Sequence, residues 1–103
     1  MIKYYFDKYV RKGIKSEIKI IDIGSGISPV TPYPYKTLFI DLEKEAIQFL
    51  KKEGFNAKVG DITNLPLKKQ CGDIILCSEV LEHVPDYKKA LKEMKRVLSK
   101  EGI

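Results

Sequence analysis

Short apolar segments rich in β-branched residues alternate along this chain with segments of helical periodicity. Short runs of this composition are typical of strands that are buried on both faces of a sheet. The expected strands are residues 18–23, 38–40, 57–59 and 73–77. The expected helices are residues 2–11, 43–53 and 87–98. Strands that alternate with helices pair in parallel, so the pattern predicts an α/β fold with a single domain over residues 1–103.

The two later helices have apolar stripes that should face the sheet. The inward side chains are expected to be Ala46, Ile47, Phe49 and Leu50 in the first of them, and Ala90, Leu91, Met94, Val97 and Leu98 in the second. Gly54 follows residues 43–53 and is expected to cap the C-terminus of that helix.

The connection between the first two strands is rich in proline. Three prolines fall within residues 27–36, and helix interiors reject proline because it lacks an N–H group and clashes with the preceding turn. We therefore expect a helix at this place to be shortened to one turn or replaced by an extended loop. Tyr33 and Tyr35 would then either pack on the surface or form a lid over a ligand.

Composition excludes several classes of protein. Hydrophobic residues make up 44% of the chain and charged residues 32%, which describes a globular protein, and no apolar run approaches the roughly 18 residues of a membrane span. We therefore expect a cytoplasmic protein without a membrane partner. Cys71 and Cys77 are too far apart for a CxxC metal half-site, and we expect both to be reduced and buried.

The net charge of +5 is divided unevenly along the chain. Residues 1–20 carry +4, residues 21–85 carry −2, and residues 86–103 carry +3. An acidic middle suits a cationic ligand, although basic ends of this kind commonly serve only to keep a surface solvated. No base-reading motif accompanies the basic ends, so a nucleic-acid partner is neither required nor ruled out.

Acidic and small residues follow the carboxyl ends of the expected strands. In an open parallel sheet, ligands bind beyond these ends, at the point where the strand order reverses. The residues at these ends are Asp22 with Gly24 and Gly26, then Asp41, then Asp61 with Ile62, and last Ser78 with Glu79. Glycines allow a tight turn and a close approach of the ligand to the backbone. The carboxylate of Asp41 could accept both hydroxyl groups of a ribose, and Asp61 beside a backbone amide could hydrogen-bond an adenine edge. Core packing alone does not require acidic residues at four successive strand ends.

Each aspartate also has a plain structural interpretation. Asp22 could cap the next element, Asp41 could be the N-cap of the helix that starts near Glu43, and Asp61 could begin a turn. A nicotinamide-binding Rossmann fold is disfavoured, because its GxGxxG pattern needs a glycine where this chain has Pro29.

The chain resembles the class I S-adenosylmethionine-dependent methyltransferases, in particular generic small-molecule and ubiquinone-type O-methyltransferases. The matching segments are IIDIGSG (20–26), FIDLEKEAI (39–47), GDITNLPL (60–67) and DIILCSEVLEHVPDYKKALKEMKRVLSKEG (73–102). The resemblance implies a Rossmann-like, doubly wound parallel sheet, reduced to about four strands in the order 3-2-1-4 with flanking helices. It also implies a transferase whose cofactor is S-adenosyl-L-methionine.

The resemblance assigns roles to individual residues. The methionine part of the cofactor would be held by Asp22, Gly24, Ser25 and Gly26, the ribose by Asp41 with Leu42, the adenine by Asp61 and Ile62, and the pocket floor would be formed by Ser78 and Glu79. The third small residue of the glycine motif is Ser28 instead of glycine, which is a departure from the family pattern.

His83 is the candidate catalytic residue. Glu79, Glu82 and His83 would share one face if their turn is helical, since residues three and four apart are neighbours there. His83 could be a general base, a ligand of a divalent metal, or a purely structural residue. We assign no metal site.

The similarity ends at residues 101–103, where the family begins its fifth strand. We expect either a truncated chain or a reduced form of the fold. The fourth strand would then be a sheet edge with apolar Ile74, Ile75 and Leu76, and such an edge favours pairing, here as a homodimer. Two functions follow: a methyltransferase with an unidentified acceptor, or a non-catalytic module, derived from a methyltransferase, that binds the cofactor or dimerises.

Overall fold

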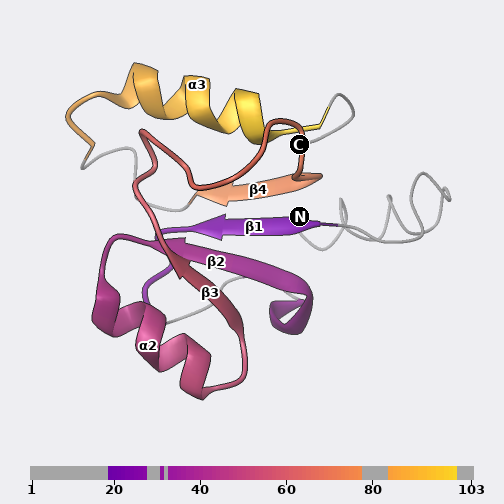
Figure 1. Cartoon of the computed structure of the whole chain (residues 1–103), viewed down its shortest axis with the longest axis vertical. Helices are drawn as coiled ribbons and strands as arrows, with labels where there is room; N and C mark the ends of the chain where they lie inside the picture. Colours follow the sequence, from indigo (N-terminus) through magenta and orange to yellow (C-terminus); the bar gives the residue numbers. More distant parts are fainter. Residues whose placement is uncertain (1–18, 28–30, 32, 78–83, 100–103) are drawn as a thin grey trace, which may run out of the picture.

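Four parallel strands form one sheet in the order β3-β2-β1-β4 (Figure 1). The computed structural model describes residues 19–27, 31, 33–77 and 84–99 of the chain. The strands are β1 (Ile20–Ile23), β2 (Thr37–Asp41), β3 (Asn56–Val59) and β4 (Ile74–Cys77). The parallel direction and the predicted order 3-2-1-4 are confirmed. The strand order reverses between β1 and β4, so a ligand site is expected at the carboxyl ends of these strands.

The central strand β1 is buried on both faces, as its apolar composition predicts. Ile20 lies beside Thr37 of β2 and beside Ile74 of β4. Because side chains alternate along a strand, Ile20 and Asp22 face one side of the sheet, and Ile21 and Ile23 face the other. All four side chains are buried.

One face of the sheet packs against α3 (Tyr87–Val97), which begins at the N-cap residue Asp86. The core on this face consists of Ile21, Ile23, Ile40, Ile62, Leu65, Ala90 and Val97. The inward stripe of α3 was predicted correctly at Ala90 and Val97, but the prediction for Leu91 is wrong, since this side chain is 47% exposed. Residues 90, 93, 94 and 97 are neighbours on one helix face, and that face places Glu93 inward in place of Leu91.

The other face of the sheet packs against α2 (Lys44–Lys52). Phe39 of β2 contacts Ile47 and Leu50 of this helix, with Phe55 packed against them. Phe49 was predicted to face inward and is instead 42% exposed. The buried residues of α2 are Ala46, Ile47 and Leu50, and these form the contact between the helix and the sheet.

Gly54 ends α2, as predicted. Its φ of +89° is a conformation that residues with a side chain rarely adopt. The Gly54 N–H donates to the Lys51 carbonyl oxygen, and the Phe55 N–H donates to the Leu50 carbonyl oxygen, both at 3.0 Å. These two bonds form the Schellman arrangement, which satisfies carbonyl groups that the helix leaves unpaired.

The connection between β1 and β2 contains a single turn of 3-10 helix, η1 (Pro34–Lys36), within its described part. This agrees with the expected shortening of a helix at a proline-rich segment. Tyr35 is exposed and its ring lies 4.9 Å from that of Phe55, whereas Tyr33 packs against Ile20 and Ile74. Both tyrosines therefore act as packing residues at these contacts.

Cys71 and Cys77 were predicted to be reduced and buried. Cys71 and Cys77 are free thiols, but they are half-buried, so the prediction that both are buried is wrong. Both lie at the margin of the core, against which their side chains pack.

The helix expected over residues 2–11 lies outside the described residues. Within the described ranges, no helix has the length and apolar character needed to cross a membrane.

Candidate functional site

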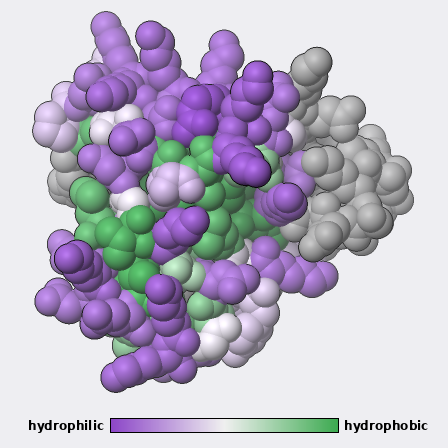
Figure 2. Space-filling view, in the orientation of Figure 1, coloured by the Kyte–Doolittle hydropathy of each residue, from purple (hydrophilic) through white to green (hydrophobic). Residues whose placement is uncertain are grey.

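A cavity of about 730 Å³ lies at the carboxyl ends of β1, β2 and β3. Its lining comes from these strand ends, the loop after β3 and the start of α3, and consists of Ile23, Gly24, Asp41, Leu42, Glu43, Gly60, Asp61, Ile62, Thr63, Val84, Pro85, Asp86 and Lys89. In the space-filling view, hydrophobic surface gathers between the hydrophilic borders formed by α3 and α2 (Figure 2). A cavity of this size, with apolar walls and a few polar groups, is typical of a small-molecule site.

The turn after β1 is shaped by two glycines. Gly24 has a φ of +78° and Gly26 a φ of +63°. The Gly24 N–H donates to the Ile40 carbonyl oxygen at 2.8 Å, which holds the turn close to the end of β2. Gly24 lines the cavity, so at this position a ligand meets backbone without an intervening side chain.

Asp41 connects the end of β2 to both neighbouring segments. Its Oδ2 accepts the Gly26 N–H at 3.1 Å, and its Oδ1 accepts the Glu43 N–H at 3.0 Å. Glu43, not Asp41, is the N-cap residue of α2, so the N-cap interpretation of Asp41 is wrong by two residues. A carboxylate has about four acceptor positions, and these two bonds use one on each oxygen. Each oxygen of Asp41 therefore keeps capacity for a ligand hydroxyl group.

Asp22 is a fully buried carboxyl group on the face of β1 that points away from α3. Neither of its oxygens has a hydrogen-bond partner within the part of the chain that the structure describes. Burial, and to a smaller extent the negative charge of Asp41, raises the pKa of Asp22 from 3.8 to about 6. With no hydrogen bond to an N–H of a following element, the capping interpretation of Asp22 finds no support among the described residues.

Asp61 begins a tight turn on the cavity wall. Its Oδ1 accepts the backbone N–H and the hydroxyl group of Thr63, both at 2.8 Å, and its carbonyl oxygen accepts the Asn64 N–H at 2.9 Å. The two bonds from Thr63, and more weakly the charge of Lys89, hold the pKa of Asp61 below its usual value. The turn interpretation is therefore confirmed, and the same carboxylate lines the cavity.

The structure brings half of the predicted cofactor-binding residues to the cavity. Those that line it are Gly24, Asp41, Leu42, Asp61 and Ile62. Asp22, Ser25 and Gly26 do not line it; Gly26 is joined to Asp41 by a hydrogen bond, and Asp22 interacts with the charge of Asp41. Ser78, Glu79, Glu82 and His83 lie outside the described residues.

Sequence reasoning missed the part of the lining that α3 supplies. Asp86 and Lys89 belong to the start of this helix and line the cavity together with Val84 and Pro85. Oδ1 of Asp86 accepts the Lys89 N–H at 3.1 Å and so caps the helix. A helix that follows a parallel strand starts at the carboxyl edge of the sheet, so the N-cap signal at Asp86 could have placed these residues.

Carboxylates outnumber ammonium groups in this lining. Asp41, Glu43, Asp61 and Asp86 are acidic, and Lys89 is basic. Such a site favours a cationic ligand, in agreement with the acidic middle of the sequence. Among the described residues, no cluster of His, Cys, Asp and Glu side chains could hold a metal ion.

The sequence profile of the methyltransferase domain family matches residues 21–103. Because this match spans most of the chain and the sheet has the order expected of the class I fold, the protein belongs to the methyltransferase domain family.

Three curated relatives indicate how far the similarity extends. An uncharacterized protein of Methanocaldococcus jannaschii is 31% identical over 91 residues, covering 85% of this chain and 39% of the relative. The uncharacterized methyltransferase YcgJ of Bacillus subtilis is 28% identical over 99 residues, with the same two coverages. Norajmaline N-methyltransferase of Rauvolfia serpentina is 33% identical over 96 residues, covering 81% of this chain and 33% of the enzyme. The chain thus spans well under half the length of these relatives.

Solved structures share the fold. The crystal structure of YcgJ has a TM-score of 0.73 at 24% identity, covering 97% of this chain and 48% of YcgJ. A SAM-dependent methyltransferase from Aquifex aeolicus has a TM-score of 0.71 at 21% identity, covering 95% of this chain and 58% of the enzyme. At these identities the likeness establishes the fold alone.

Proposed function

We propose that this chain binds S-adenosyl-L-methionine in the cavity at the carboxyl ends of the strands and transfers its methyl group to an acceptor. The observation that carries this proposal is the buried carboxyl group of Asp22, which lies behind the cavity lining, interacts with the charge of Asp41 in that lining, and has no partner for either oxygen among the described residues. An uncompensated buried carboxylate is costly, and a nearby ligand cation stabilises its ionised form. S-adenosyl-L-methionine carries two positive charges, on its sulfonium and ammonium groups.

The other polar groups of the site fit the uncharged parts of the same ligand. Asp41 keeps acceptor capacity on both carboxylate oxygens, which suits the two hydroxyl groups of a ribose. Asp61 is held ionised by Thr63 and Lys89 next to the buried Ile62, which suits the amino group and the flat apolar face of adenine.

The chain contributes binding and orientation to the reaction. When bound, S-adenosyl-L-methionine supplies a methyl group on a cationic sulfur, and this carbon–sulfur bond breaks as the acceptor's nucleophilic atom bonds to the carbon. Asp41 binds the ribose, and the charge of Asp22, which lies behind the lining, favours the cationic end of the ligand without contacting it. Apolar Ile23, Ile62 and Val84 limit the access of water. Holding two reactants in line contributes about 7–11 kcal/mol to such reactions in favourable cases.

Cofactor binding without methyl transfer is the second candidate function. The described residues that fit the ligand come from the ends of β1 and β2 and the loop after β3, and all of them are assigned to the cofactor, none to an acceptor. A methyl-transfer assay with a panel of amine and hydroxyl acceptors distinguishes the two functions once binding is established.

Isothermal titration with three probes tests the proposal. S-adenosyl-L-methionine carries two cationic groups, S-adenosyl-L-homocysteine carries the ammonium group alone, and 5′-methylthioadenosine carries neither. We expect Asp22→Asn to weaken binding of the first two probes by roughly 1.5–3 kcal/mol, or about 10- to 150-fold, because the Coulomb attraction between this buried charge and the cationic groups is removed. Binding of 5′-methylthioadenosine should change little.

A matched control is Glu45→Gln, which removes one negative charge from an exposed position of α2. This variant should bind all three probes like the parent protein. A parent protein that binds neither S-adenosyl-L-methionine nor S-adenosyl-L-homocysteine would refute the proposal. Equal weakening of all three probes by Asp22→Asn would show that the charge of Asp22 does not recognise the cationic groups.

A further inference from the structure

The placement of one cavity wall depends on contacts outside the cavity. This wall is the loop after β3, residues 60–63, and a second wall is the start of α3 with Asp86 and Lys89. At its beginning the loop is tied to β2, where the Gly60 N–H donates to the Asp41 carbonyl oxygen at 3.0 Å. Beyond the wall, the loop continues to α3, and side chains of that helix bind its backbone.

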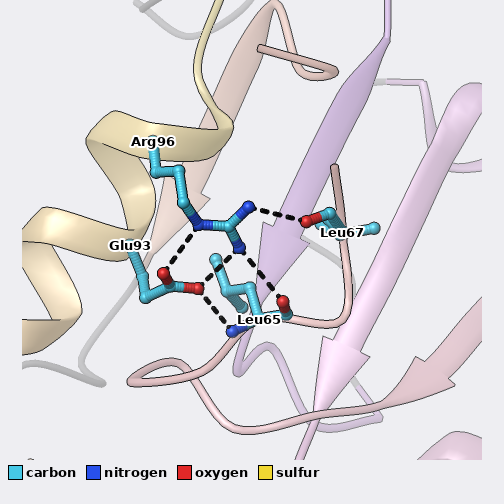
Figure 3. A network of polar contacts seen from close by, with 4 residues as sticks. All are labelled: Leu65, Leu67, Glu93 and Arg96. Carbon is cyan, nitrogen blue, oxygen red and sulfur yellow. Dashed lines mark hydrogen bonds and ion pairs between the residues drawn. The ribbon is translucent and has the colours of Figure 1, made fainter. Parts of the chain in front are cut away.

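Glu93 and Arg96 of α3 hold this backbone (Figure 3). Oε2 of Glu93 accepts the Leu65 N–H at 2.7 Å. Arg96 donates from Nη2 to the Leu65 carbonyl oxygen at 3.2 Å and from Nη1 to the Leu67 carbonyl oxygen at 2.9 Å. These contacts satisfy three backbone groups: the N–H and the carbonyl group of Leu65, before Pro66, and the carbonyl group of Leu67, after it. Pro66 itself has no N–H to donate.

The two side chains also hold each other. Nε of Arg96 donates to Oε1 of Glu93, and Nη2 donates to Oε2, each at 2.7 Å. We call this pair the Glu93–Arg96 clamp. The Glu93 side chain is 17% exposed, so solvent and salt screen the pair less than they would a pair of fully exposed charges. A lysine in place of Arg96 would keep the charge but could not supply the planar fork that binds four oxygen atoms.

The clamped segment is in close contact with the start of the wall. A Cβ atom added to Gly60 would lie 2.8 Å from Cδ of Pro66 and 2.9 Å from Cγ2 of Ile40, so the backbone of Gly60 packs directly on both residues. Pro66 lies between the two carbonyl groups that Arg96 binds. A shift of Pro66 relative to α3 therefore changes the packing at Gly60, where the wall begins.

We propose that Glu93 and Arg96 are positioning residues that set the loop wall, residues 60–63, at the correct distance from α3 for the adenosine part of the ligand. This inference rests on the function proposed above. The turn between Asp61 and Thr63 is held by its own hydrogen bonds, so the wall keeps its local shape while the clamp decides where it lies. If the correct placement is populated only part of the time, the apparent Kd rises in inverse proportion to that fraction.

Two clamp variants and one control test the inference by titration with S-adenosyl-L-homocysteine. Glu93→Gln weakens the ion pair, Arg96→Lys keeps the charge but removes the fork, and Lys92→Gln changes an exposed residue of the same helix. We expect both clamp variants to bind at least tenfold more weakly than the parent, because charge-assisted bonds that order the loop are lost. Lys92→Gln should bind like the parent.

Hydrogen exchange provides a readout that a purely structural role would not reproduce. In the clamp variants, the backbone amides of Gly60 and Leu65, whose partners Asp41 and Glu93 lie outside the loop, should exchange faster. The amides of Thr63 and Asn64, which bond within the turn, and those of Ile21 and Phe39 in the sheet should keep the parent's rates. Loss of stability throughout the fold would accelerate exchange in the loop and in the sheet alike, and that result would overturn the positioning role.

The remaining outcomes separate this inference from the proposed function. A parent that binds the probe, beside folded clamp variants that bind it equally well, overturns the clamp alone. A parent that binds neither S-adenosyl-L-methionine nor its demethylated product overturns both. If neither clamp variant folds, Gly60→Ala acts on the same contact from the loop side and should show the same two changes; a folded Gly60→Ala protein with unchanged affinity overturns the inference.

Discussion

Replacing Asp22 with asparagine should stabilise the fold relative to the parent as the pH rises toward neutrality, although it weakens ligand binding. The side chain is fully buried, and neither carboxylate oxygen has a hydrogen-bond partner among the described residues. Asparagine has nearly the same shape but cannot ionise. The substitution therefore removes the cost of holding a negative charge in a buried place near Asp41.

The size of the effect follows from the pKa of Asp22. Folding raises this pKa from 3.8 to about 6, mainly through burial. Below pH 3.8 the carboxyl group is protonated in both states, and it costs no ionisation energy. Between these two values the unfolded state ionises first, so the parent loses stability as the pH rises, and above about pH 6 the loss is complete at roughly 3 kcal/mol. A buried asparagine amide has its own desolvation cost, but that cost does not vary with pH.

Urea unfolding of the parent and of Asp22→Asn, measured from pH 3.5 to pH 7.5 without ligand, checks this reasoning. The free energy of unfolding of the variant minus that of the parent should rise across this range by roughly 3 kcal/mol. Glu45→Gln, at an exposed position, is the matched control and should show no such rise. A difference for Asp22→Asn that stays constant with pH would refute the reasoning, because it would mean that Asp22 ionises as easily in the folded protein as in the unfolded chain.

Three further predictions follow from the same structure. Asp41→Ala should weaken binding of S-adenosyl-L-homocysteine by roughly 1.5–3 kcal/mol for each ribose hydroxyl group that loses its charged acceptor, and unchanged affinity in the titration would place the ribose elsewhere. Gly54→Ala should lower the free energy of unfolding by about 1 kcal/mol, since the φ of +89° strains a residue with a side chain, whereas Lys51→Ala at an exposed helical position should be nearly neutral in the same urea titration. We also propose that β4, which among the described strands pairs with β1 alone, associates along its other edge with a second copy as a two-fold dimer; sedimentation that shows a folded monomer at high concentration would contradict this.

The local sequence was sufficient to predict the strands and the two described α-helices. The β-branched runs identified β1 and β4, and Gly54 marked the end of α2, because these signals depend on backbone preferences that act within a few residues. The strand ends carrying Asp41 and Asp61 could likewise be assigned to one edge of the sheet, since all strands of a parallel sheet end at the same edge.

Side-chain burial on the helices was less predictable. Phe49 and Leu91 are apolar residues within apolar stripes, yet both are exposed, because the width of the buried stripe depends on how closely each helix approaches the sheet. For the same reason Glu93, a charged residue, lies on the inward side of α3, where it accepts a hydrogen bond from the Leu65 N–H. Hydropathy ranks such a residue as surface, and the backbone partner that stabilises it is 28 positions away in the sequence.

The class of fold and the edge of the sheet where a ligand would bind could be predicted from the sequence, because apolar periodicity and turn chemistry are local properties. The tertiary fold sets the environment of each site residue. It buries the carboxyl group of Asp22 without a partner among the described residues. It places Asp41 where its carboxylate accepts hydrogen bonds from both Gly26 and Glu43. It also joins the segment that follows the loop wall to α3 through Glu93 and Arg96. Each of these depends on atoms brought together from distant parts of the chain, and burial and electrostatic energies are set by such neighbours.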